Sequence, residues 1–156
     1  MKRDFSLPLT DLAGDPVRDA DAASVNAVAA VRDWMALGMP SDGDARKQLD
    51  IALKEAPALT LGRAAVNALV TRYQDEQNIA GEELLKRYRL AKRIHEDTRS
   101  KLPTELSTEE LDLIKRLLVK LGYGPIVVGA ATELLEKDYV GAVAYADAVS
   151  VSEVQL

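Results

Sequence analysis

The segment from Ser107 to Lys137 constrains the fold more than any other part of the sequence, because it encodes two helices separated by a sharp break. Ser107 and Glu110 have the spacing of a capping box, in which each side chain satisfies a backbone N–H at the start of a helix. Gly122 supplies the left-handed residue that ends this helix, and Pro125 suits the first turn of the next. Two amphipathic helices joined by so short a turn are expected to pack together and to need a third surface that covers them.

Apolar periodicity predicts helices elsewhere along the chain. The expected helices span residues 24–37, 44–55, 60–73, 82–97, 107–121 and 125–137. In the helix over 82–97, the side chains expected to face the core are those of Leu84, Tyr88, Ala91 and Ile94, with His95 beside them at the edge of the core. The apolar spacing therefore predicts that the helices are amphipathic.

The two ends of the chain carry signals of extended structure. Phe5, Leu7 and Leu9 alternate with Ser6 and Pro8, and a turn follows, so we expect a small β hairpin over residues 4–18. Residues 138–156 alternate enough to predict a strand or an extended tail that pairs with this hairpin or is captured by another chain. The predicted fold is mainly α: a bundle of five or six helices with an N-terminal hairpin, forming one domain over residues 1–137.

Composition limits the classes of function. The 156 residues include no cysteine, which excludes disulfides and thiolate metal sites and is typical of a reducing compartment. No apolar run reaches the roughly 18–20 residues of a membrane-spanning helix, and the first residues have no apolar region typical of a signal peptide. The charge is unevenly spread, because residues 59–103 are net basic whereas 1–58 and 104–156 are net acidic.

The sequence carries no catalytic or metal-binding motif. His95 is the single histidine, and no serine in a nucleophile elbow accompanies it. The acidic pairs lack the further ligands of a calcium loop, and the glycines near 62 and 122 match neither a phosphate loop nor a dinucleotide fingerprint. We therefore expect a protein that is not an enzyme and has no cofactor and no metal.

A basic face on the helix over residues 82–97 is the feature that most suggests binding. It consists of Lys86, Arg89, Lys92 and Arg93. Such a face can meet nucleic-acid phosphates, but glutamates four residues before Lys86 and Arg87 also make it a typical solvated helix surface. The overall pI of about 5.0 disfavours a dedicated nucleic-acid binder.

Two other sets of residues are candidates for protein contacts. Glu109, Glu110 and Asp112 offer an acidic surface to a basic partner. In the C-terminal segment, the candidates for strand exchange with a neighbour are Tyr139, Tyr145, Val149 and Val151.

Several strings resemble a group of small proteins encoded in tailed phages and prophages. They are Asp4-Phe-Ser-Leu-Pro-Leu9, Asp11-Leu-Ala-Gly14, Leu59-Thr-Leu-Gly62, Asp75-Glu-Gln-Asn78, Gly81-Glu-Glu83, Lys86-Arg87-Tyr88 and Tyr123-Gly-Pro-Ile-Val-Val-Gly129. The resemblance covers residues 4–17 and 58–136, which implies that residues 19–55 are a candidate insertion. It carries no functional residue that can be transferred.

What the resemblance implies is a phage setting. The leading hypothesis is then a non-enzymatic interaction module of virion structure or assembly, located in the host cytoplasm or the virion, with phage-encoded protein partners and no membrane. A homo-oligomer stays open. The alternatives are a phage inhibitor of a host defence or nucleic-acid-handling complex that uses the acidic surface, and a nucleic-acid binder that uses the basic helix.

Overall fold

The computed structural model describes residues 1–19 and 54–139, together with isolated positions between 28 and 51. Within this part the protein is mainly helical, with four α-helices: α3 (Leu61–Val70), α4 (Gly81–Arg99), α5 (Thr108–Lys120) and α6 (Pro125–Glu136). A short 3-10 helix, η1 (Gln74–Glu76), lies between α3 and α4. The helices expected over 24–37 and 44–55 lie largely outside the described residues, and the predicted insertion of 19–55 stays a prediction.

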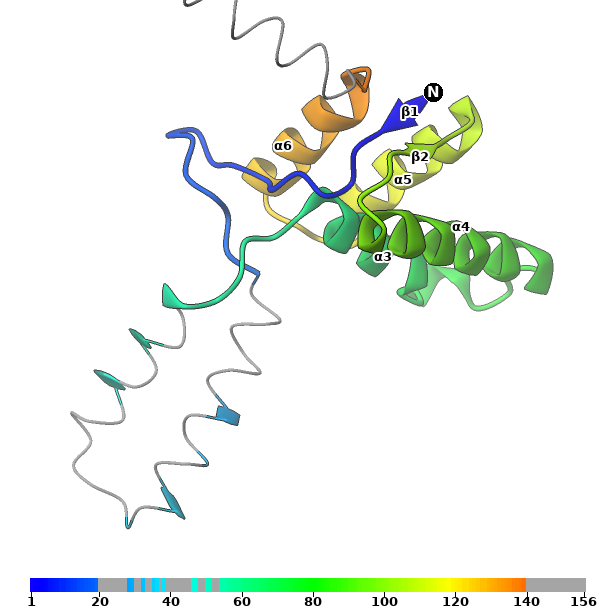
Figure 1. The fold of residues 1–156 in the computed structure, drawn as a ribbon. Helices are drawn as coiled ribbons and strands as arrows, with labels where there is room; N and C mark the ends of the chain where they lie inside the picture. The colour runs from blue at the N-terminus through cyan, green and yellow to red at the C-terminus, as the bar shows by residue number, and fades with distance from the viewer. Residues whose placement is uncertain are drawn as a thin grey trace, which may run out of the picture.

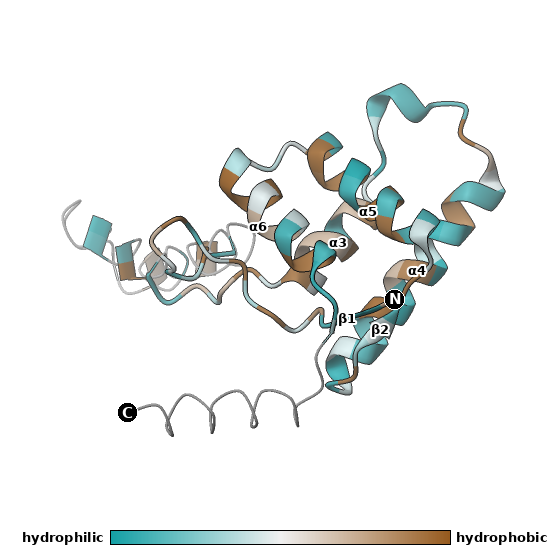
Figure 2. Ribbon diagram, turned by 90° about the horizontal axis from the view of Figure 1, so that it is seen from above, coloured by the Kyte–Doolittle hydropathy of each residue, from teal (hydrophilic) through white to brown (hydrophobic). Residues whose placement is uncertain are grey.

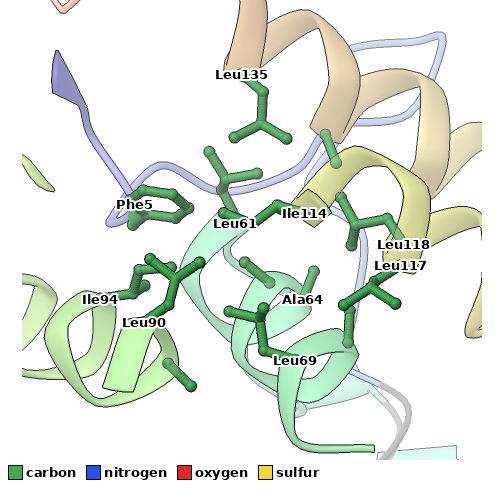
Figure 3. Close-up of a cluster of buried hydrophobic side chains, with 14 of the residues drawn as sticks. Phe5, Leu61, Ala64, Leu69, Leu90, Ile94, Ile114, Leu117, Leu118 and Leu135 are labelled. Carbon is green, nitrogen blue, oxygen red and sulfur yellow. The ribbon is translucent and has the colours of Figure 1, made fainter. Parts of the chain in front are cut away.

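The centre of the molecule is α3, which packs against α4 on one side and against α5 and α6 on the other (Figure 1). Alanines make this possible: Ala64, Ala65 and Ala68 are fully buried and let the neighbouring helices approach closely. Thr60 caps α3, because its side-chain oxygen accepts the backbone N–H of Arg63 at 3.1 Å. Leucine and isoleucine side chains from all four helices then meet Phe5 in one core (Figure 3).

The helix pair predicted around residues 107–137 is confirmed. Ser107 and Glu110 form the complete capping box of α5, Gly122 ends the helix at a φ of 87°, and Pro125 opens α6. On α6 the buried residues are Ala131 and Leu135, which belong to the predicted apolar face.

The strands differ from the prediction. The only named strands of the described residues are β1 (Lys2–Arg3) and β2 (Thr104–Glu105), which pair antiparallel with Lys2 opposite Glu105. The predicted hairpin over 4–18 is reduced to a chain reversal with a single bridge between Thr10 and Pro16. The cause is a third segment, around Leu59, that bonds to both arms of the reversal. The N–H of Leu9 donates to the carbonyl of Leu59, and the N–H of Leu59 donates to the carbonyl of Val17. The N–H of Val17 donates to the carbonyl of Leu9, and all three distances are 2.7–2.8 Å.

The face that α4 buries also differs from the prediction. Leu84 and Tyr88 were expected in the core and are exposed, and His95, expected at the core edge, is exposed as well. The buried residues of α4 are Arg87, Leu90, Ala91 and Ile94. The buried face of α4 is rotated about the helix axis relative to the prediction, because Arg87 faces the core and is paired there with the carboxylates of Glu76 and Glu83.

Candidate interaction surfaces

The outward side of α4 carries apolar and basic side chains together. Leu85 is 45% exposed and Tyr88 is 58% exposed, and Leu84 lies beside them. Exposed Arg89, Lys92 and Arg99 share this side of the helix, since Arg89 follows Leu85 by four residues, Lys92 follows Tyr88 by four, and Arg99 follows Lys92 by seven. We call these six residues the α4 outer face. Figure 2 shows polar and apolar stretches alternating along α4.

The four predicted basic residues are all exposed, and two of them pair with glutamates. Arg93 lies on the flank that faces α5, where its Nη2 contacts Glu110 Oε1 at 2.7 Å. Lys92 is 3.8 Å from Glu96 one turn later. Within the described part of the chain, Lys86 and Arg89 make no ion pair and are exposed.

The predicted acidic surface is partly used by the fold itself. Glu110 accepts the backbone N–H of Ser107 at 2.9 Å and also pairs with Arg93. Burial raises the pKa of the Glu110 carboxyl, but the bonds from Ser107 and Arg93 outweigh burial and leave the pKa below its ordinary value. Glu109 and Asp112 are exposed, so two of the three predicted carboxylates face solvent.

An ionic cluster around buried Arg87 joins η1, α4 and α5, and the apolar pattern of the sequence does not predict it. Arg87 is 4% exposed, and its two terminal nitrogens donate to the two oxygens of Glu76 at 2.9 and 2.8 Å. Lys120 Nζ lies 2.9 Å from Glu76 and 3.0 Å from Asp75, and it sits 4.9 Å from the centre of the Tyr73 ring. We call this group the Arg87–Glu76 cluster.

Hydrogen bonding sets the charge state of the cluster. The bonds from Arg87 lower the pKa of Glu76 to about 2, because they outweigh the opposing effect of burial, and the bond from Lys120 lowers it further. The only signal in the sequence is Arg87 itself, which lies three residues before Leu90 and seven before Ile94, in the middle of the apolar spacing. A charged residue at such a position requires a buried partner.

The C-terminal candidates are described only at their start. The backbone N–H of Tyr139 donates to the carbonyl of Lys2 at 3.2 Å, so the segment after α6 begins against the open edge of β1. The tail was predicted to pair with the hairpin over residues 4–18, whereas this one contact is made to Lys2, which precedes that segment. Tyr145, Val149 and Val151 lie outside the described residues.

A groove of about 210 Å³ runs between α6 and the turn that follows Pro8. Leu12 and Ile126 are exposed at its walls, and Gly129 leaves open space along its floor. Three of the groove's charged side chains are those of Asp11, Glu133 and Lys137.

Taken together, the described residues form a small helical domain that presents a mixed apolar and basic helix face. Among the residues that the structure describes, no group of three or more metal-ligating side chains gathers. No described helix has both the length and the apolar character needed to cross a membrane. Comparison with protein-family models, curated proteins and solved structures finds no match for the chain.

Proposed function

We propose that this protein is a non-enzymatic protein-interaction module of a phage, which acts in virion structure or assembly through the α4 outer face. The observation that carries the proposal is the exposure of Leu84, Leu85 and Tyr88 on one helix that is otherwise firmly packed. The phage setting is supported only by the resemblance of the sequence strings described above.

The composition of the face favours a protein partner. Tyrosine and arginine are enriched at the residues that dominate binding energy in interfaces, and apolar centres with a charged rim are the usual anatomy. Tyr88 and Leu85 supply the apolar centre, and Arg89 and Lys92 supply the rim. A helix laid against this face would bury these side chains without changing the core.

The face is also held in place before any partner binds. Leu90, Ala91 and Ile94 anchor α4 in the core, and the Arg87–Glu76 cluster fixes its first half to η1 and α5. Preorganised side chains lose less entropy on binding than mobile ones, which raises affinity.

The test is a pull-down from lysate of infected or lysogenic cells with the full chain as bait, with and without nuclease. A double variant, L85S with Y88A, should lose captured phage proteins at least tenfold. The control is V119S, which changes an apolar residue on α5 that is at least as exposed as Leu85 and Tyr88.

Each outcome decides between the hypotheses. Phage structural proteins retained after nuclease and lost only with L85S/Y88A support the proposal. Capture that is lost after nuclease treatment and abolished by the double variant R89A/K86A favours the nucleic-acid binder and overturns the proposal. Capture of host proteins that is lost on charge reversal at Glu109 and Asp112 favours the inhibitor instead.

A further inference from the structure

We infer that the α4 outer face is the docking site of the chain's own C-terminal segment, residues 140–156. The inference rests on the proposed function in one respect, since it assigns an occupant to the same face. A partner protein would then bind by displacing this segment.

Charge and polarity make the two surfaces complementary. Residues 140–156 contain two acidic residues, Asp147 and Glu153, and no lysine or arginine. Their larger side chains are almost all valine, with Tyr145 and Leu156. An acidic, apolar segment fits a face in which Leu84, Leu85 and Tyr88 are bordered by Arg89, Lys92 and Arg99. These bases outnumber the acids of the same side, Glu82 and Glu96, of which Glu96 pairs with Lys92.

The attachment point of the segment lies near one end of the face. Tyr139 is hydrogen-bonded to Lys2 of β1, β1 pairs with β2, and β2 packs against α4. The chain from Tyr139 to Val149 spans up to ~33 Å when extended, and α4 with its 19 residues is about 28 Å long. The segment therefore reaches along the whole helix.

Tethering favours this arrangement over docking on a second copy. A segment joined by a short linker has an effective concentration near its site on the order of millimolar. A second copy at micromolar concentration competes poorly with such a segment.

The groove beside α6 is the rival site within the same reach, because Lys137 lines it. Its charges argue against it, since Asp11 and Glu133 would repel the acids of the segment, with Lys137 alone opposing them. The groove therefore serves as the comparison in the test.

The absence of cysteine from the chain permits a clean test by disulfide trapping in the full-length protein. The variant L85C/V149C should form an intramolecular disulfide in oxidised glutathione at least tenfold faster than I126C/V149C. Leu85 and Ile126 are matched, being 45% and 47% exposed, so access of the thiol does not distinguish them. Parallel variants carry the second cysteine at Val143 or at Val151 instead of Val149. They detect docking in which the segment is shifted along the helix.

Charge reversal supplies a second readout. Changing Arg89 and Lys92 to glutamate should slow trapping, and changing Asp147 and Glu153 to lysine in that background should restore it. Equal rates at Leu85 and Ile126 in every register overturn the inference. Faster trapping at Ile126 places the segment in the groove, and disulfide-linked oligomers alone assign it to a second copy; both results also overturn it.

The failure of this inference and the failure of the proposed function are distinguishable. Trapping uses only the purified chain, whereas the pull-down requires a partner. If the segment does not dock but L85S/Y88A still abolishes capture, the face binds partners directly and only the inference is wrong.

Discussion

At the scale of single residues, the ends of α4 and α5 offer a matched pair of left-handed positions. Lys101 has a φ of 56° and closes α4, with its N–H donating to Thr98 and the N–H of Leu102 donating to Asp97. Gly122 has a φ of 87° and closes α5. A side chain at such a position strains the backbone, whereas glycine adopts it freely.

The variants K101G and G122A should therefore move stability in opposite directions. We expect K101G to raise the free energy of unfolding by about 0.5–1 kcal/mol and G122A to lower it by about 1 kcal/mol. A Cβ at Gly122 would meet no atom within 4 Å, so its cost is conformational and not steric. Urea denaturation measures both, and a loss of stability in K101G would contradict the argument.

These two positions also show what local sequence can predict. Gly122 follows an apolar repeat, and glycine after a helix is a strong stop signal, so the end of α5 was predictable. Lysine carries no such signal, and the left-handed turn at Lys101 arises because the chain must turn back to place Thr104 and Glu105 beside β1.

At the scale of elements, the Arg87–Glu76 cluster attaches the segment between α3 and α4 to the bundle. Replacing Glu76 with glutamine leaves Arg87 buried without a charged partner except Glu83, whose carboxylate is 3.6 Å away. We expect E76Q to lower the free energy of unfolding by about 3 kcal/mol, as for other broken buried pairs. The control E96Q, which removes the exposed pair with Lys92, should cost less than about 0.5 kcal/mol by the same denaturation measurement.

The same cluster predicts how stability depends on pH. The pKa of Glu76 is about 2 in the folded protein, below its ordinary value of 4.5. The carboxylate therefore stabilises the fold fully above about pH 4.5, and this contribution is lost as the pH falls towards 2. Denaturation between pH 6 and 2.5 should show a smaller loss in E76Q than in the natural chain, and parallel curves would contradict this role.

The rotation of α4 shows why helix existence was easier to predict than helix orientation. Leu84, Tyr88 and Ala91 have good helical spacing, and local periodicity assigns them to the core. Arg87 occupies the buried side because Glu76 lies eleven residues earlier, beyond any window that the pattern considers. The missed cluster and the unpredicted outer face are therefore two consequences of one error.

At the scale of the whole molecule, the contacts that close the fold are non-local and short. β1 and β2 have two residues each, which is too short to leave an alternation in the sequence. The predicted alternation of Phe5 and Leu9 was correct as burial but not as a hairpin ladder, since Leu59 supplies the partner groups. Amphipathic periodicity was sufficient to predict the helical core. The pairings of β1 with β2 and of Leu9 with Leu59 could not be predicted in this way, because they form between segments that are distant in the sequence.

Arg3 links the two ends of this fold, and it gives the last prediction. It is 3% exposed, its Nε donates to the carbonyl of Leu135 at the end of α6, and its Nη1 contacts Lys2 and Asp138. Replacing Arg3 with methionine keeps an apolar stem but leaves the Leu135 carbonyl without this donor, so we expect the free energy of unfolding to fall by about 2 kcal/mol.

The partner carboxylate provides the control, because Asp138 is 88% exposed and screened by water. The variant D138A should cost less than about 0.5 kcal/mol, since exposed ion pairs contribute little. Urea denaturation of both variants separates the two contributions of Arg3. Equal losses would mean that the ion pair, and not the buried hydrogen bonds to the backbone, holds the N-terminus against α6. A loss confined to R3M would place the stabilisation in the backbone bonds, above all the one to Leu135, which joins residues 132 positions apart.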